Sequence, residues 1–185
     1  MKCGIVVFPG SNCDHDCNHI LKKILNQETH WLWHKDVVDL SSFDLIVLPG
    51  GFSYGDYLRA GAISRFSPVM NSVIRFAENG GKVLGICNGF EILLESSLLP
   101  GALMQNHTRK FICKNVYVRV ETTETPFTQK CNDKSVLEIP IAHHQGSYYI
   151  DPHSLSDLEE KGQILFRYCD AKGGISELSN PNGSV

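Results

Sequence analysis

A cysteine between two glycines is the residue of this chain best suited to do chemistry. Cys87 has Gly85 two residues before it and Gly89 two residues after it, the glycine-x-nucleophile-x-glycine pattern of a nucleophile elbow. A short apolar run precedes the turn and an apolar-periodic segment follows it, so we expect a strand, a sharp turn and a helix over 82–95. The glycines would let strand and helix approach closely, because they carry no Cβ.

The same arrangement predicts a reactive thiol. The turn would place Cys87 at a helix N-terminus, where unpaired N–H groups and the helix dipole favour the thiolate. The thiolate, not the thiol, is the nucleophile. The alternative is a buried core cysteine in a tight turn, which is common for free cysteines. Glycines on both sides favour the nucleophile.

A glycine-rich segment, residues 49–56, follows the strand predicted over 44–48. Gly50, Gly51 and Phe52 are among its first residues. In an open α/β sheet this segment lies at the same carboxyl edge as Cys87, where ligands bind. Backbone N–H groups of such a turn can stabilise an oxyanion, with the second donor from the residue after the nucleophile, Asn88. The alternative is an ordinary turn. It is not a phosphate loop, because no Gly-Lys-Ser/Thr follows.

The order of the predicted elements indicates an α/β fold. Apolar or alternating runs predict strands over 3–8, 29–34, 44–48 and from 82, and helices are expected from a cap at Ser11 or Asn12 to about Asn26 and over 67–78. The second half is expected to hold β structure over 111–121 and 135–142, a helix over 153–161 and a strand over 164–168. We expect an open, doubly wound, mixed but mainly parallel sheet with helices on both faces, in a single domain of residues 1–185.

Composition excludes several classes of protein. The chain has 185 residues, 42% hydrophobic and 20% charged, which is ordinary for a soluble globular protein. The formal net charge is -3 and the basic residues are scattered, so we expect no nucleic-acid partner. No apolar run reaches spanning length, and no signal peptide precedes the first strand, so no membrane partner is expected. Seven cysteines without a secretory signal predict reduced thiols in the cytoplasm.

Two other groups of residues could do chemistry. The segment from Cys13 to His19 holds two cysteines and two histidines, but helical spacing does not bring all four together, so a solvated helix start is preferred to zinc and no metal is expected. His143 and His144 follow a predicted strand and could supply a base for a cysteine nucleophile. A polar loop with at most one histidine near substrate is the preferred interpretation.

Several strings together identify a family. Residues 8–14, 48–63 and 84–90, with shorter matches at 110–113 and 141–143, resemble the glutaminase subunits of phosphoribosylformylglycinamidine synthase, which are class I (triad) glutamine amidotransferases. The resemblance runs from Met1 to Val185, and the string Gly-Gly-Phe-Ser-Tyr-Gly-Asp is specific to this subunit within the class.

The resemblance implies a mechanism. Cys87 would attack the side-chain amide of glutamine, the backbone N–H groups of Gly51 and Asn88 would hold the oxyanion, and water would hydrolyse the thioester after ammonia leaves. Gly50, Gly51, Phe52 and Glu91 are the expected substrate-binding residues; the family commonly carries glutamine where this chain has Glu91. Ammonia would pass to a larger synthetase subunit, often accompanied by a small third subunit. ATP and Mg²⁺ would be used by that partner, and no cofactor is expected in this chain.

The chain departs from the family pattern in two places. Residues 142–146 read Ala-His-His-Gln-Gly where the family usually has Ala-His-Gly-Glu-Gly, which leaves the role of His143 and His144 open. The family's catalytic base and its orienting carboxylate lie in a His-Pro-Glu string, and no His-x-Glu occurs here. We therefore expect a sequence truncated at its C-terminus that hydrolyses glutamine very poorly or not at all.

Three other functions compete with this one. A protease-like or deglycase-like protein with a cysteine elbow would need a histidine partner from His107, His143 or His144. A non-catalytic scaffold would bind the synthetase without hydrolysing glutamine. A metal-binding module would be built on the segment from Cys13 to His19.

Overall fold

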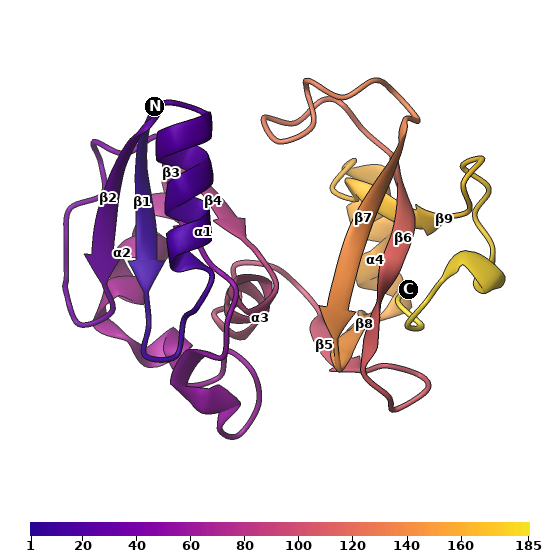
Figure 1. Cartoon of the computed structure of the whole chain (residues 1–185), viewed down its shortest axis with the longest axis horizontal. Coiled ribbons are helices and arrows are strands. Elements are labelled where there is room, and N and C mark those ends of the chain that lie inside the picture. The colour runs from indigo at the N-terminus through magenta and orange to yellow at the C-terminus, as the bar shows by residue number, and fades with distance from the viewer. The chain divides into compact units, whose positions relative to one another are not determined.

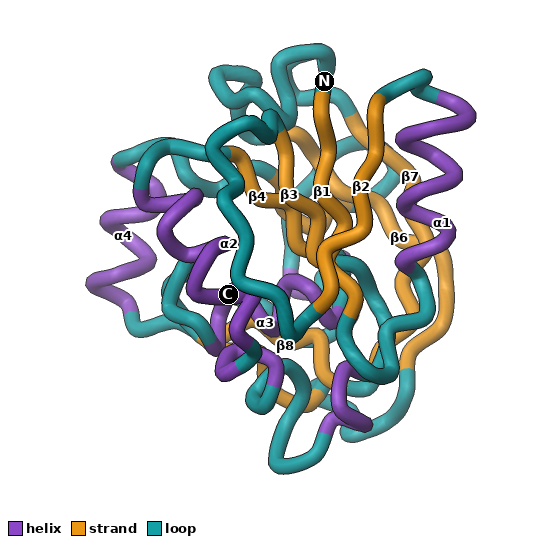
Figure 2. The backbone as a smooth tube through the Cα atoms, turned by 90° about the vertical axis from the view of Figure 1, so that its left-hand side faces the viewer, coloured by secondary structure: helices purple, strands orange, loops and turns teal.

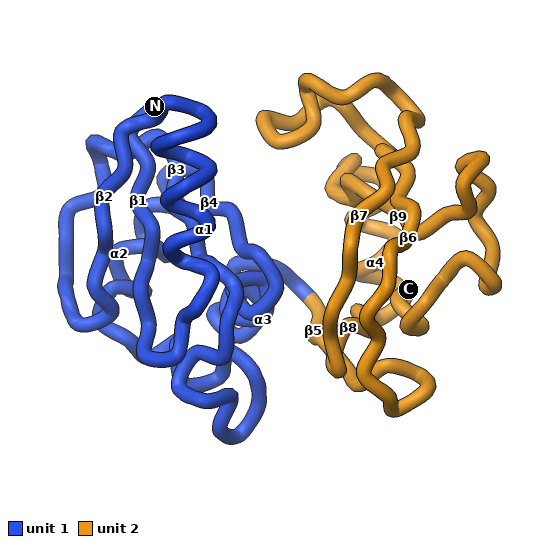
Figure 3. The backbone as a smooth tube through the Cα atoms, in the orientation of Figure 1, with its two compact units in different colours: residues 1–100 blue, residues 101–185 orange.

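The computed structural model describes residues 1–185, which divide into two compact units. Unit 1 comprises Met1–Pro100 and unit 2 comprises Gly101–Val185 (Figure 3). Cys87 and the glycine-rich segment both lie in unit 1. The prediction of a single domain stays a prediction.

Unit 1 is built on a four-stranded parallel sheet. Its strands lie side by side in the order β2-β1-β3-β4 (Figure 2). All four predicted strands are confirmed, as β1 (Lys2–Val7), β2 (Glu28–Trp33), β3 (Leu45–Leu48) and β4 (Lys82–Gly85). Leu48 lies opposite Gly85 in the register, so the segments that follow β3 and β4 leave the sheet at the same edge.

Helices cover both faces of this sheet. On one face, α2 (Pro68–Glu78) and α3 (Asn88–Glu95) pack against the apolar side chains of β1 and β3. On the other face, Leu21 packs on Cys3, Ile5 and Val47; it belongs to the π-helical segment His19–Ile24, which continues α1 (Asp14–Asn18). The predicted doubly wound architecture is confirmed.

The start of the first helix differs from the prediction. The helix begins at Asp14, and the residue before it, Cys13, makes no capping hydrogen bond through its side chain. Ser11 is not the cap because its hydroxyl accepts a hydrogen bond from the Phe8 N–H at 3.2 Å. Asn12 is not the cap because its side-chain oxygen accepts from the Cys13 thiol at 3.2 Å. Both polar side chains therefore stabilise the turn after β1 instead of the helix.

Unit 2 is antiparallel. Its three-stranded sheet has the order β7-β6-β9 (Figure 1). The side chains of Val116, Val118 and Val120 are buried along β6, as their alternation predicts. The predicted elements correspond to β6 (Ile112–Val120), β7 (Val136–His143), α4 (Pro152–Glu160) and β9 (Phe166–Cys169). A second pair of strands was not predicted, β5 (Ala102–Gln105) and β8 (Gln145–Tyr149).

The contact between α3 and the end of β3 has no room for a side chain. A Cβ added to Gly89 would overlap the backbone carbonyl of Leu48. We expect Gly89→Ala to lower the free energy of unfolding by at least about 3 kcal/mol, because neither backbone can move away without unpacking the helix. Urea unfolding of the purified variant measures this.

Gly80→Ala is the matched control. Gly80 has φ +84°, and nothing lies within 4 Å of an added Cβ. That variant should lose only the conformational cost of about 1–2 kcal/mol. Equal losses in the two variants would show that the helix does not depend on the close approach at Gly89.

Candidate active site

Cys87 occupies a strained turn between β4 and α3. Its φ and ψ are 52° and -112°, a left-handed conformation that costs a residue other than glycine about 1–3 kcal/mol. Strand and helix approach closely on either side of the turn, because a Cβ on Gly85 would lie 2.6 Å from the Gly89 carbonyl oxygen. The Ile86 N–H donates to the Leu48 carbonyl at 3.0 Å, which ties the turn to β3. This is the geometry expected of a nucleophile elbow.

The glycine-rich segment lies beside Cys87. A Cβ added to Gly50 would be 3.4 Å from the Cys87 Cβ, so Gly50 lies next to the Cys87 side chain. Gly51 has φ +143°, and an added Cβ there would lie 2.8 Å from the Asn12 backbone nitrogen. The structure therefore brings Gly50 and the nucleophile together, as the sequence predicts.

The turn after β1 is a third part of this site. Ser11 and Gly51 form an isolated antiparallel bridge, whose hydrogen bonds come from the Asn12 and Phe52 N–H groups. The Gly51 N–H is not used in that bridge. Its role as an oxyanion donor, with the Asn88 N–H, stays a prediction, as does the contact of Phe52 with substrate.

Cys13 lies close to the nucleophile, which the sequence did not indicate. Its Sγ is 3.4 Å from the position of an added Gly50 Cβ, the same distance as the Cys87 Cβ. A side chain at Gly50 would thus meet a cysteine from each of two turns, the one after β1 and the one after β4.

The side chain of Asn88 links the glycine-rich segment to α3. It is 2% exposed. Its oxygen accepts from the Ser53 N–H at 3.0 Å, and its amide nitrogen donates to Asp56 at 3.2 Å and to Glu91 at 2.9 Å. The sequence predicted a role only for the Asn88 backbone. The buried amide and its carboxyl partner Asp56 were missed, since no local spacing connects residues 32 positions apart.

The side-chain carboxyl group of Glu91 has a pKa close to neutral pH. Burial raises its pKa to about 7; the hydrogen bond from Asn88 works in the opposite direction, and the charges of Asp56 and Glu95 add to the rise. The pKa of Asp56 is also raised by burial, although its hydrogen bond from Asn88 opposes this. Near pH 7 the Glu91 carboxyl group is therefore about half neutral.

The prediction of a stabilised Cys87 thiolate is wrong for the chain as it stands. Burial of the thiol among the surrounding backbone raises its pKa, and the carboxylate of Glu91 raises it further, with smaller contributions from Cys13 and Asp56. The backbone N–H of Asn88 lowers the pKa, but it does not overcome the other effects. The residue as a whole remains exposed, so a substrate can reach it. In the resting site the thiol keeps its proton.

His143 is the last residue of β7, in unit 2. A Cβ on Gly146 would overlap its ring, so the imidazole lies against the Gly146 backbone. Burial lowers the pKa of His143, and its Nε2 is 3.5 Å from the Asn182 amide nitrogen. It is therefore neutral near pH 7. The roles of His143 and its exposed neighbour His144 stay open.

The zinc alternative built on the segment from Cys13 to His19 has no group of ligands to support it. No three or more His, Cys, Asp and Glu side chains are grouped so that they could hold a metal ion. None of the helices combines the length and the apolar character needed to cross a bilayer.

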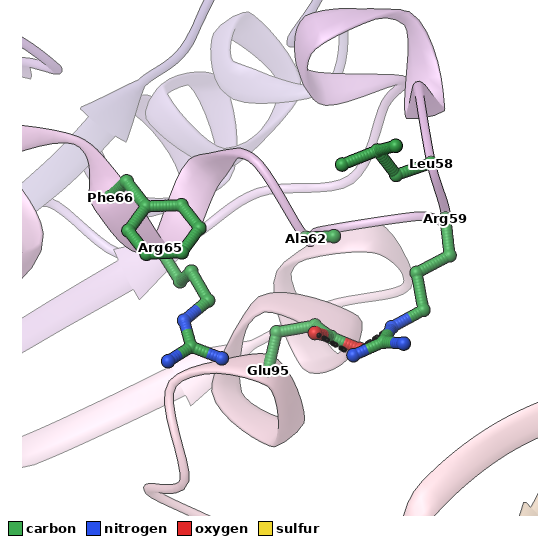
Figure 4. A pocket seen from close by; sticks show the side chains of 6 residues that line it. All are labelled: Leu58, Arg59, Ala62, Arg65, Phe66 and Glu95. Carbon is green, nitrogen blue, oxygen red and sulfur yellow. Dashed lines mark hydrogen bonds and ion pairs between the residues drawn. The ribbon is translucent and has the colours of Figure 1, made fainter.

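A pocket of about 230 Å³ lies on unit 1 (Figure 4). Its polar wall is the ion pair in which the Arg59 guanidinium donates to both oxygens of Glu95, at 2.5 and 2.8 Å. Glu95 is the last residue of α3, whereas Cys87 precedes the first, so roughly 12 Å of helix separates them. The pocket is lined by Leu58, Arg59, Ala62, Arg65, Phe66 and Glu95 and is not the reaction site.

The electrostatics of this site can be tested by Glu91→Gln. Below pH 7 Glu91 is neutral, and above pH 7 its negative charge opposes the Cys87 thiolate. We expect iodoacetamide to alkylate Cys87 of the variant about two- to fivefold faster than the unchanged protein at pH 8, and at the same rate at pH 5, since charge interactions near the protein surface contribute about 0.2–1 kcal/mol. Mass spectrometry of the Cys87 peptide gives the rates.

Glu95→Gln is the control, because it removes a carboxylate from the far end of the same helix. Its alkylation rate should follow that of the unchanged protein at both pH values. If Cys87 of Glu91→Gln is also alkylated at the rate of the unchanged protein at both pH values, Glu91 does not affect the thiol.

Comparison with known proteins agrees with this geometry. The family model for the CobB/CobQ-like glutamine amidotransferase domain matches residues 1–185. The chain is 54% identical over 185 residues to the phosphoribosylformylglycinamidine synthase subunit PurQ of Moorella thermoacetica, covering all of this chain and 78% of that protein. It is 55% identical to the PurQ subunit of Acaryochloris marina, with the same coverage.

Among solved structures, the chain is similar to one in PurLQS from Thermotoga maritima. The TM-score is 0.82 and the identity 40%, over 99% of this chain and 77% of that one. The agreement in sequence and structure extends over both units. The chain therefore belongs to the family of glutamine amidotransferase domains, and within it to the PurQ subunits of phosphoribosylformylglycinamidine synthase.

Proposed function

We propose that this chain is the glutaminase subunit of phosphoribosylformylglycinamidine synthase. It hydrolyses the side-chain amide of glutamine and delivers ammonia to the ATP-dependent subunit that makes formylglycinamidine ribonucleotide in purine biosynthesis. The observation that carries the proposal is the strained Cys87 turn in contact with Gly50, in a chain that matches PurQ subunits throughout.

The chemistry follows from the positions of these groups. The Cys87 sulfur attacks the amide carbon of glutamine, and negative charge develops on the amide oxygen. The N–H groups of Gly51 and Asn88 would stabilise that charge. Ammonia leaves with a γ-glutamyl thioester behind it, and water hydrolyses the thioester to glutamate and free thiol. Because the resting thiol is protonated, a base must take its proton as the sulfur attacks.

Glu91 and Phe52 are the proposed side chains for substrate selection. Glu91 lies one helical turn after the nucleophile, and its neutral form can donate and accept hydrogen bonds as an amide does. Phe52 is 62% exposed and follows Gly51 directly, so its ring is free to cover a bound substrate. Gly50 and Gly51 complete the proposed contact surface through their backbones.

The partners are a synthetase subunit and a small third subunit. The Thermotoga maritima structure is described as PurLQS, an assembly that includes a chain similar to this one. ATP and Mg²⁺ would be used by the synthetase, and no cofactor is proposed for this chain. A cytoplasmic location, expected from the cysteine content, stays a prediction.

Glutamine should protect Cys87 from alkylation. A bound glutamine would cover the thiol, so saturating glutamine should slow iodoacetamide labelling of Cys87 about tenfold or more, while labelling of the exposed Cys113 stays constant. Asparagine serves as the control ligand. A chain that binds the synthetase subunit but shows no protection would be a scaffold, and one that also fails to bind it would be a protein of the protease-like or deglycase-like class.

Without its synthetase partner, the chain of 185 residues should release ammonia from glutamine very poorly. It contains no His-x-Glu string to supply the family's base and orienting carboxylate, and the resting thiol holds its proton. We expect a rate close to that of Cys87→Ser in a coupled glutamate assay. Robust ammonia release that disappears in Cys87→Ser would refute this expectation and assign the base to residues within the chain.

A further inference from the structure

The glycine-rich segment takes a conformation that its own residues disfavour. Tyr54 has φ 54° and ψ 26°, Gly55 has φ 69° and Asp56 has φ 53°. Glycine adopts this left-handed region freely and aspartate tolerates it, but a tyrosine rarely does. A run of three such residues does not persist unless contacts outside the segment hold it.

Backbone contacts supply part of that support. The Phe52 N–H donates to the Gly10 carbonyl at 3.0 Å, and the Tyr54 N–H donates to the Pro9 carbonyl at 2.6 Å. The Ser53 N–H donates to the side chain of Asn88 at 3.0 Å. These bonds tie the segment to the turn after β1 and to the start of α3.

The phenol of Tyr54 supplies a separate attachment. Its hydroxyl lies 2.7 Å from Nδ1 of His34 and 2.8 Å from the hydroxyl of Ser67. These two partners are 5% and 4% exposed, so the hydroxyl is bound in the interior. The ring packs edge-on against His34 at 5.6 Å between centroids and lies 6.5 Å from Phe8.

Both partners of the hydroxyl are committed to this contact. Ser67 stands at the N-cap position of α2, where a serine side chain usually bonds to the helix, yet its hydroxyl makes no capping bond. His34 is fixed by its backbone, since its N–H donates to the Val7 carbonyl and its carbonyl accepts from Val69. Burial lowers the pKa of His34, so its neutral ring can accept the phenol proton.

We propose that Tyr54 is a positioning residue for glutamine hydrolysis: its hydroxyl, anchored on His34 and Ser67, fixes the backbone of Gly50 to Ser53 beside Cys87. Tyr54 thus has a disfavoured backbone conformation, and its own side chain prevents the segment from relaxing out of that conformation. The inference rests on the proposed function, because positioning has meaning only for a reaction at Cys87.

The first test asks whether the hydroxyl holds the segment. Tyr54→Phe keeps the ring and removes only the hydroxyl, and Tyr57→Phe makes the same change at an exposed tyrosine three residues away. We expect amide hydrogen exchange over residues 50–56 to become about tenfold faster in Tyr54→Phe, with unchanged exchange in β1 and β3. Tyr57→Phe should exchange like the unchanged protein. Unchanged exchange in Tyr54→Phe would overturn the proposal.

The second test asks whether this support matters for the reaction. In the glutaminase assembled with its synthetase partner, Tyr54→Phe should lower kcat about 10- to 100-fold, because a small displacement of catalytic groups is costly. KM should change less than about threefold. A purely structural role would lower the unfolding temperature but leave kcat per folded molecule unchanged, and that result would overturn the proposal.

Rescue by a conservative change completes the test. His34→Asn retains a polar atom close to the position of Nδ1 and should keep kcat within about threefold of the unchanged protein, whereas His34→Leu should behave like Tyr54→Phe. Equal kcat values in the two His34 variants would contradict the anchoring role. If the unchanged assembly releases no ammonia from glutamine, the proposed function fails, whereas the exchange experiment still decides whether Tyr54 holds the segment.

Discussion

The approach of α3 to the end of β3 is the contact on which the site depends. Gly89 lies against the Leu48 carbonyl so closely that no Cβ fits, and Gly85 lies against Gly89 in the same way. The chain enters α3 through the turn at Cys87, whose positive φ costs about 1–3 kcal/mol. Burial of Ile92 and Leu93 from the same helix offsets this cost, since each large apolar side chain contributes about 1.5–3 kcal/mol.

The electrostatics of the site show why a helix N-terminus does not by itself activate a thiol. A helix dipole contributes about 0.3–1 kcal/mol to a charge at its end, which is less than one pKa unit. Desolvation of the Cys87 thiol and the nearby Glu91 carboxylate act in the opposite direction and outweigh it. The resting site therefore holds a protonated thiol beside a half-neutral carboxyl group, and activation depends on a base that acts during the reaction.

The sequence predicted those features that depend on neighbouring residues. The strands of unit 1 are apolar runs ended by glycine or polar turns, and the elbow is a spacing of two glycines around Cys87, so both could be found locally. The strands β5 and β8 were missed because they show little apolar alternation. The Asn88 amide and the hydroxyl of Tyr54 were missed because their partners come from other elements of unit 1.

The elbow at Cys87 and the glycine-rich segment are held in place by different kinds of contact. At the elbow, the absence of side chains at Gly85 and Gly89 forces the conformation, and close backbone contact leaves no freedom. In the glycine-rich segment, side-chain hydrogen bonds fix the conformation. The Asn88 side chain accepts from the Ser53 N–H, and the buried side chains of His34 and Ser67 bind the Tyr54 hydroxyl. The first kind of contact is visible in a sequence, because glycine spacing is local. The second is a set of tertiary hydrogen bonds, so the precision of the segment depends on the packing of β2 and α2, which contribute nothing else to the site.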